Sequence, residues 1–274
     1  MCTLILGIDV AGPGTVIAGA NRDEDPSRPS DPPGVLVTNP RVVGGRDRRA
    51  GGTWLALREG RLLVAMLNRR DSAAAAPTRR SRGLLALEVA AGPDAAVGAR
   101  PAIDRALEAV GRDDYAPFSL VVAAPESCWL LAHEPPHAPR ASEIGPGWHV
   151  LTHTELDDPR EPRAARLLRE LSGWEPLSPD EALHGLAARL REHGTGTPGE
   201  PAGPDAVCVH AGRMVTVSST RIGFDRRKAR YLHVEGRPCV SPEVDHTSLL
   251  SGDRPRSRSA GADLPGSSAG TPRS

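Results

Sequence analysis

The amino-acid sequence predicts an α+β fold of four layers, in which two antiparallel sheets stack face to face and helices cover both outer faces, an αββα sandwich. The first observation is the order of the elements, because groups of strand-like segments alternate with pairs of helix-like segments along the 274 residues. The second is that short turns join neighbouring strand-like segments, which is typical of antiparallel pairing. The third is the hydrophobic content of 39%, which supplies a core for such a sandwich.

Strands fill the first quarter of the chain. Leu4 to Val10 and Thr15 to Ala20 are apolar runs on either side of a glycine-bearing loop, and they predict a β-hairpin. Further apolar runs predict strands at residues 34–39, 53–58 and 61–67. Glu59 and Gly60 join the last two runs as a tight hairpin turn.

Two helices and a second group of strands follow. Leucine, isoleucine and valine recur at three- and four-residue spacing in residues 82–91 and 102–110, which predicts helices. Extended apolar runs predict strands at residues 118–124, 127–133 and 148–152. A second helix pair is predicted at residues 163–171 and 180–191, and Ser178 with Pro179 provides an N-cap and a first-turn proline for its second member.

The last strands complete one domain, which we expect to span residues 1–240. Residues 206–210 and 214–219 predict a hairpin, and residues 230–235 predict an edge strand. From residue 241 the composition shifts towards glycine, serine, proline and arginine. We therefore expect residues 241–274 to form a disordered tail.

Charge and composition exclude several classes of function. The chain has 34 basic and 34 acidic side chains and 3% aromatic residues, so we expect no nucleic-acid partner. The first ten residues lack a basic segment and no apolar run reaches bilayer length, so we expect a cytoplasmic protein without a signal peptide or a membrane span. Lys228 is the one lysine among the basic residues, which indicates the codon bias of a GC-rich, bacterial genome. Single arginines therefore carry little weight.

The cysteines are widely separated, at Cys2, Cys128, Cys208 and Cys239. No two of them form a Cys-x-x-Cys pair, so the spacing favours neither a zinc site nor a disulfide framework. We expect no bound metal and no cofactor. Cys128 and Cys208 lie in apolar runs, where a thiol is typically buried and inert. The sequence gives no indication of the oligomeric state.

Cys2 suggests a catalytic site. An initiator methionine is normally removed when the second residue is small, so we expect the mature chain to begin with Cys2. One residue would then carry both a thiol and a free α-amine, whose ordinary pKa values are about 8.5 and 8. The amine can accept the thiol proton, so a single residue can be both nucleophile and base. The alternative is that Cys2 is an ordinary small residue near the end of the chain.

The hairpin register provides a partner for this residue. A turn centred between Gly12 and Pro13 pairs residues whose numbers sum to about 25, which places Asp23 opposite Cys2. A carboxylate there would hold the α-ammonium and orient the thiolate. The alternative is that residues 21–24 are a solvated strand end.

Several motifs follow one another in an order that resembles the NRDE family, also called the transport and Golgi organisation protein 2 family. The motifs are Cys2-Thr3-Leu4, Asn21-Arg22-Asp23-Glu24, Arg28-Pro29, Gly45-Arg46-Asp47, Ala50-Gly51-Gly52-Thr53-Trp54-Leu55, Ala65-Met66-Leu67-Asn68-Arg69, Ser81-Arg82-Gly83-Leu84 and the segment from Gly147 to Pro159. They span most of the chain expected to be ordered.

The resemblance implies a hydrolase. The NRDE family is in turn similar to cysteine-type N-terminal nucleophile hydrolases, such as bile salt hydrolases and penicillin V acylase, whose fold is the αββα sandwich. It implies cleavage of a non-peptide C–N amide bond with Cys2 as the nucleophile and Asp23 in contact with its amine and thiol. Asn21 would support the loop, and Asn68 would donate to the oxyanion.

Other positions vary from the pattern or have two interpretations. His153 stands where the hydrolases place a substrate-facing asparagine, and it adds a titration near pH 6.5 to the catalytic set. Relatives carry an aromatic residue, an asparagine and an arginine at the positions of Asp25, Ser119 and Val217, and the substrate-side arginine of the hydrolases has no clear counterpart. We expect Arg22 and Trp54 to contact the substrate, although a tryptophan at the start of a strand is more often a core residue.

A second function is a non-catalytic carrier or chaperone. Relatives in the NRDE family have been linked to haem trafficking, acyl-lipid homeostasis and organisation of the secretory pathway. Under that hypothesis Cys2, His149 or His153 would ligate haem iron. Both functions imply a small amphipathic molecule as the partner. A hydrolase needs the thiol and free amine of Cys2, whereas a carrier should keep most of its ligand affinity without the thiol.

Overall fold

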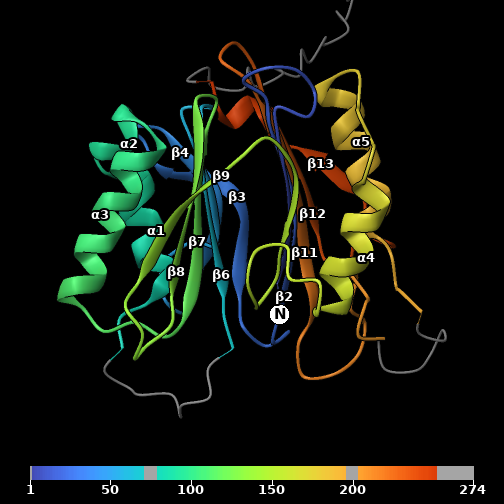
Figure 1. Ribbon diagram of the computed structural model, residues 1–274, viewed down its shortest axis with the longest axis horizontal. Coiled ribbons are helices and arrows are strands. Elements are labelled where there is room, and N and C mark those ends of the chain that lie inside the picture. The colour runs from blue at the N-terminus through green and yellow to red at the C-terminus, as the bar shows by residue number, and fades with distance from the viewer. Residues whose placement is uncertain (1, 71–78, 196–202, 252–274) are drawn as a thin grey trace, which may run out of the picture.

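The computed structural model, which describes residues 2–70, 79–195 and 203–251, has the four layers that the sequence predicts (Figure 1). Two antiparallel sheets face each other in the middle of the molecule. Helices α1 (Arg82–Ala91), α2 (Asp94–Val97) and α3 (Ala99–Arg112) cover the outer face of one sheet. Helices α4 (Pro162–Leu171) and α5 (Pro179–Leu190) cover the outer face of the other.

The first sheet has six strands in the order β10-β1-β2-β11-β12-β13. Their bounds are β1 (Thr3–Ile8), β2 (Val16–Glu24), β10 (Gly147–Leu151), β11 (Val215–Phe224), β12 (Ala229–Glu235) and β13 (Glu243–Asp245). The predicted amino-terminal hairpin is formed by β1 and β2, and each of these strands has a neighbour on both sides. The start of the chain is therefore held in the interior of the sheet.

The second sheet has seven strands in simple chain order, from β3 to β9. Their bounds are β3 (Ser30–Val37), β4 (Val42–Asp47), β5 (Leu55–Arg58), β6 (Leu62–Asn68), β7 (Phe118–Ala124), β8 (Ser127–His133) and β9 (Arg140–Ile144). The predicted turn between β5 and β6 is confirmed, because Glu59 and Gly60 have φ values of 49° and 65°. Positive φ at both central residues is the geometry of a two-residue hairpin that matches the twist of the strands.

Three apolar clusters separate the four layers, as the alternation of side chains along β1 illustrates. Leu4 and Leu6 point between the two sheets, whereas Ile5 points towards α4 and α5. A third cluster fills the space between the second sheet and the helices α1 to α3, around Ile103 and Tyr115. Successive residues of a strand face opposite sides, so the six-stranded sheet is apolar on both faces.

Two strands of the second sheet were not predicted, for different reasons. In β4 the residues Gly44 and Gly45 weaken the apolar pattern, yet they are needed because added Cβ atoms would lie 2.4 Å from the Leu55 carbonyl oxygen and 2.4 Å from the Trp54 ring. In β9, an edge strand, most side chains are exposed, so no apolar run marks it.

Near the end of the chain the structure differs from the prediction. Residues 206–210 do not form a strand, because β11 pairs with β2 on one side and β12 on the other, which leaves no free edge for them. The predicted edge strand at residues 230–235 is β12, but β13 lies outside it, so it is not an edge. The first part of the predicted tail thus contains β13 and a 3₁₀ turn at Thr247–Leu249, and its residues 252–274 lie outside the described residues.

Among the described ranges of the chain, none of the helices has the length and the apolar character that crossing a membrane requires.

We predict that the contact between the β4–β5 loop and the beginning of α1 is sensitive to a single methyl group. A Cβ added at Gly52 would lie 2.1 Å from the carbonyl carbon of Gly83, so Gly52→Ala must displace this backbone. The expected loss in the free energy of unfolding is about 1–3 kcal/mol, measured by urea denaturation. Gly111→Ala, on α3 with no atom within 4 Å of the added Cβ, is the matched control and should be neutral or stabilising. Equal effects of the two changes would contradict this packing.

Candidate active site

The alternation of side chains along β1 and β2 divides the predicted site between two faces of the sheet. Cys2 and Arg22 point between the two sheets, where both line a pocket. Asn21 and Asp23 point to the opposite face, towards the helices α4 and α5. Residues one apart on a strand cannot share a face, so the Asn-Arg-Asp-Glu motif contributes to both layers.

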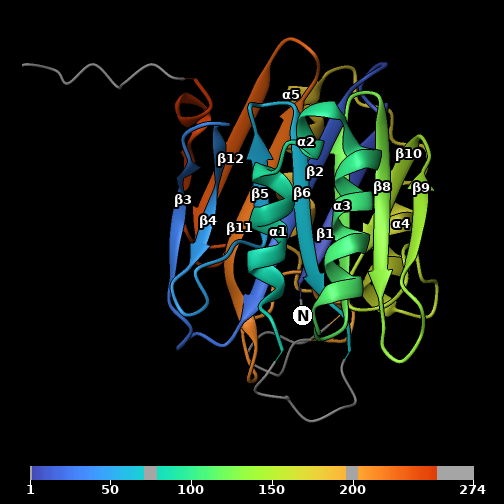
Figure 2. The same ribbon diagram turned by 90° about the vertical axis from the view of Figure 1, so that its left-hand side faces the viewer.

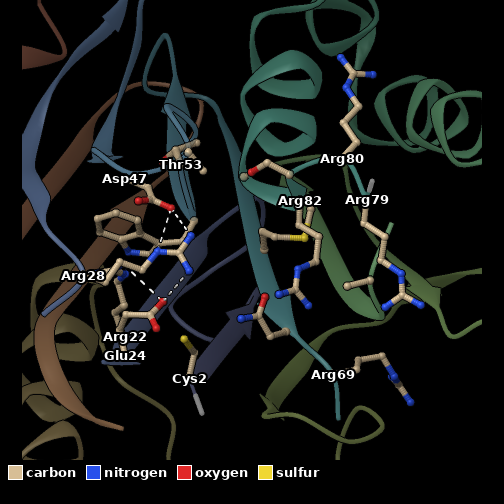
Figure 3. Close-up of a pocket in the computed structure, with 17 residues that line it drawn as sticks. Cys2, Arg22, Glu24, Arg28, Asp47, Thr53, Arg69, Arg79, Arg80 and Arg82 are labelled. Atoms are coloured by element: carbon tan, nitrogen blue, oxygen red, sulfur yellow. Dashed lines mark hydrogen bonds and ion pairs between the residues drawn. The ribbon is translucent and has the colours of Figure 1, made fainter. Parts of the chain in front are cut away.

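The pocket lies at one end of the sandwich and has a volume of about 460 Å³. The beginning of β1, the end of β6 and the beginning of α1 meet at this end (Figure 2). Arginines dominate its wall, and they are Arg22, Arg28, Arg69, Arg79, Arg80 and Arg82. Glu24 and Asp47 are the two carboxylates among the lining residues. Figure 3 shows Cys2 between two groups of these arginines.

The first group lies on the side of β2. The Arg28 guanidinium donates to Asp47 at 2.5 Å (Figure 3). Arg22 donates to Ser30 Oγ at 3.1 Å. The Arg22 guanidinium also stacks over the Trp54 ring at 4.3 Å from its centroid. Arg22 and Trp54, which we expected at the substrate, therefore form one cation–π pair on the pocket wall.

The second group lies on the side of β6 and α1. Arg69 is buried and donates to Glu155 at 2.6 Å, and Arg80 donates to Asp113 at 2.6 Å. Arg82, in the first turn of α1, donates to the Pro117 carbonyl at 2.8 Å. The six arginines of the lining outnumber its two carboxylates, and Glu155 and Asp113 pair with Arg69 and Arg80 from outside the lining.

The Cys2 thiol contacts the backbone of Asp23. Its Sγ lies 3.9 Å from the Asp23 carbonyl oxygen, as a weak hydrogen bond. Burial raises the pKa of the Cys2 thiol, so the thiolate needs a base to form. This environment fits a nucleophile that is activated by an adjacent base rather than one that is already ionised.

The register that we predicted for the hairpin is wrong by one residue. Thr3 pairs with Asn21 and Ile8 pairs with Val16, so the paired numbers sum to 24 and the turn is centred on Gly12. Asp9 adopts a φ of 58° and closes the longer turn through a bond from its N–H to the Thr15 carbonyl at 2.9 Å. Asp23 consequently does not stand opposite Cys2.

The Asp23 carboxylate is part of a buried network under the helical layer. It accepts hydrogen bonds from Thr216 Oγ1 at 2.7 Å and from Arg163 Nη1 at 3.3 Å. The same Arg163 nitrogen donates to Thr3 Oγ1 at 2.7 Å, which ties α4 to the first residue of β1. Burial raises the pKa of Asp23, and the two donors act against this rise. The contact between Asp23 and the thiol is therefore through its backbone.

Asn21 supports the site from outside the pocket. Its side-chain amide donates to the Leu190 carbonyl at 2.9 Å and to the Val207 carbonyl at 3.0 Å. These bonds hold the end of α5 and the segment at residues 206–210 against β2. Asn68, by contrast, lines the pocket together with Cys2, at the end of β6.

His153 is buried beside the site but does not line the pocket. Neither ring nitrogen has a hydrogen-bond partner among the described residues. Burial, followed by the positive charges of Arg70 and Arg163, lowers the pKa of His153 to about 4. His153 is therefore neutral near pH 7.

His149 does not line the pocket, and both of its ring nitrogens have hydrogen-bond partners. Its Nδ1 lies 2.7 Å from Asp157 and its Nε2 lies 3.0 Å from the Gly145 carbonyl. Of the three residues considered as haem ligands, only Cys2 lines this pocket.

Two functional contacts were not predicted from the sequence. Arg163 and Thr216 complete the surroundings of Asp23, but they stand 140 and 193 positions further along the chain. Arg69, Arg79 and Arg80, which also line the pocket, carry little weight in the sequence because of the codon bias. No local spacing marks either set, since both depend on how distant elements pack.

The family described as Transport and Golgi organisation 2 matches residues 1–217. Comparison with curated protein sequences gave no match.

The fold is that of N-terminal nucleophile hydrolases. The structure is similar to a Caenorhabditis elegans orthologue of N-acylethanolamine-hydrolyzing acid amidase, with a TM-score of 0.54 and 16% identity over 81% of this chain and 92% of the other. It is also similar to a mutant of the conjugated bile acid hydrolase from Clostridium perfringens, with a TM-score of 0.51 and 12% identity over 92% of this chain and 95% of the other.

We predict that His153 makes the stability depend on pH. Its pKa is lowered to about 4 in the folded chain, so between about pH 6.5 and pH 4 the unfolded chain binds more protons. The free energy of unfolding should therefore fall as the pH falls through this window. His153→Gln should reduce the fall in melting temperature between pH 7 and pH 4.5, which differential scanning fluorimetry can measure. His233, whose pKa burial also lowers to about 4, leaves a remaining slope in this variant. Unchanged slopes would contradict the assignment.

Proposed function

The chain belongs to the Transport and Golgi organisation 2 family, and from that premise we propose that it is an amide hydrolase whose nucleophile is the thiol of Cys2. The proposal is that it cleaves a non-peptide C–N amide bond in a substrate that carries an anionic group. The observation that carries the proposal is the position of Cys2, which lines an arginine-rich pocket at the beginning of the first strand.

The activation step requires the mature chain to begin at Cys2. The α-amine of Cys2 then takes the proton of its own thiol, and the thiolate attacks the carbonyl carbon of the amide. Burial raises the pKa of this thiol, so a base on the same residue removes the need for a free thiolate in the resting state. The Asp23 carbonyl, 3.9 Å from Sγ, orients the thiol on the pocket wall.

The next step places negative charge on the carbonyl oxygen. Asn68 is the exposed amide on the pocket wall, and its side-chain N–H groups are donors for that oxyanion. Such a donor contributes a few kcal/mol, of the order of 3, to the transition state. The tetrahedral intermediate then breaks its C–N bond, and the leaving amine takes the proton held by the Cys2 ammonium.

Hydrolysis of the acyl-enzyme completes the cycle. The acyl group remains on Sγ as a thioester, and a water molecule attacks it while the α-amine accepts a proton from the water. The thioester C–S bond breaks, the carboxylic acid leaves, and the thiol regains its proton. Cys2 thus acts as nucleophile, base and acid in turn. Asn21 and Asp23 position β2, the strand that carries Arg22 into the pocket.

The charge of the pocket supports an anionic substrate. Six arginines and two carboxylates line it, and an arginine guanidinium binds a carboxylate, sulfonate or phosphate through paired hydrogen bonds. Arg22 is held by its stacking on Trp54, so it presents its charge without a large loss of side-chain entropy. The two structural neighbours are named as an acid amidase that hydrolyses N-acylethanolamines and as a hydrolase of conjugated bile acids.

We predict that Cys2 is required for turnover. Cys2→Ala should reduce release of nitroaniline from glutaryl-p-nitroanilide, an anionic amide, by roughly 10³-fold or more, because no acyl-enzyme can form. Cys128→Ala, which removes a buried thiol of β8, should keep the activity of the wild type and is the matched control.

Binding of the same anilide, measured by calorimetry, distinguishes a carrier from an enzyme. Binding without turnover in the wild-type chain, retained in Cys2→Ala, would contradict the hydrolase and favour the carrier.

We predict that Arg82 contributes to the choice of substrate. Arg82→Gln should lower kcat/KM for glutaryl-p-nitroanilide about 10- to 100-fold, because a charge-assisted hydrogen bond contributes about 1.5–3 kcal/mol. The neutral butyryl-p-nitroanilide should be cleaved at an unchanged rate. Arg100→Gln, an exposed arginine of α3 paired with Asp104, is the control and should leave both substrates unaffected. Equal losses for the charged and the neutral anilide would show that Arg82 has only a structural role.

A further inference from the structure

A second cluster of reactive side chains lies outside the arginine-lined pocket. It consists of His193, Cys208, His210 and Cys239, and their potential ligand atoms all lie within 4.8 Å of one another. We propose that this cluster is a structural zinc site with two cysteine and two histidine ligands. The proposal does not depend on the hydrolase activity, because none of the four residues lines the pocket.

The distances between the ligand atoms fit one tetrahedral ion. Zinc binds sulfur at about 2.3 Å and nitrogen at about 2.0–2.1 Å, so the edges of a tetrahedral site are about 3.8 Å between two sulfurs and about 3.6 Å between sulfur and nitrogen. Cys208 Sγ lies 3.7 Å from Cys239 Sγ and 3.5 Å from His210 Nε2. Cys239 Sγ lies 3.0 Å from the same nitrogen, and a small rotation of either side chain would open this edge.

The fourth residue completes the set from a different element. His193 follows the end of α5, and its ring packs edge-on against that of His210 at 4.6 Å between centroids. A donor set of two thiolates and two imidazoles is soft enough to select zinc over magnesium or calcium, which prefer oxygen ligands. Four protein ligands leave no open position, which is the character of a structural site rather than a catalytic one.

Hydrogen bonds hold the three contributing segments together. The N–H groups of Val207 and Cys208 both donate to the Glu192 carbonyl, at 3.0 and 2.8 Å. Arg191 Nε donates to the Pro238 carbonyl at 3.0 Å, next to Cys239. These hydrogen bonds place the ligand-bearing segments next to one another, so the four side chains need little rearrangement to reach one ion.

The position of the cluster gives it a role in the fold. Residues 206–210 do not pair as a strand, yet the Val207 carbonyl accepts a bond from Asn21 and the Val209 N–H donates to Thr216 Oγ1 at 2.9 Å. Thr216 in turn donates to the Asp23 carboxylate. A zinc ion bound to Cys208 and His210 would fix residues 206–210. This segment supports Asn21 directly and Asp23 through Thr216.

The first test is the metal content of the full chain, purified under reducing conditions without chelators. Mass spectrometry of the metal should find about one zinc per chain. Replacement by Co²⁺ should give the visible bands of a tetrahedral ion and a near-ultraviolet band from thiolate ligands. Cys208→Ser should lose both signals, whereas Cys128→Ser, which removes a buried thiol elsewhere, should keep them.

A second variant keeps the test valid if Cys208→Ser does not fold. His193 is exposed, so His193→Ala should fold and should bind zinc at least about 10-fold more weakly in competition with a chromophoric chelator. Two results would overturn the proposal. One is a reduced wild-type chain that binds neither added Zn²⁺ nor Co²⁺, and the other is a native disulfide between Cys208 and Cys239 whose reduction creates no metal site.

Discussion

The two-residue period of the amino-terminal hairpin is the constraint on which the site depends. Because neighbouring residues of β2 face opposite sides, Arg22 reaches the pocket between the sheets while Asn21 and Asp23 reach the helical layer. β1 follows the same period, so Cys2 lies on the pocket face. A slip of one residue in the pairing of β1 with β2 would exchange these faces. The pairing of β1 with β10 and of β2 with β11 prevents such a slip.

The helical layer holds this hairpin in place from behind. Asp23 is buried, and its bonds to Arg163 and Thr216 join three elements that are distant in the chain. Removing one partner of such a buried pair leaves an uncompensated charge, which typically costs about 3–5 kcal/mol. The network therefore fixes the backbone that contacts the Cys2 thiol, and it makes the position of Cys2 depend on the packing of α4 and β11.

Much of the fold could be predicted from the sequence, because hydrophobic periodicity is local. The hairpin turn at Glu59 and the N-cap of α5 at Ser178, which accepts from the Glu181 N–H at 3.2 Å, depend on a few adjacent residues. The predicted register of the first hairpin is wrong by one residue because Asp9 adopts a positive φ and lengthens the turn. The buried partners of Asp23, the arginine pocket and the cluster around Cys208 could not be predicted, since they form where remote segments meet. The motif resemblance identified Cys2 without specifying these surroundings.

Cys2 can supply both the nucleophile and the base only when Met1 is absent, and the intact mass of the purified, untagged protein measures this. We expect a mass that is short by one methionine, with the α-amine of Cys2 free. A single covalent adduct at Cys2 after incubation with an anionic amide would then agree with the proposed acyl-enzyme. A protein that retains Met1 has no amine on Cys2 to accept the thiol proton, and that mass would exclude this mechanism.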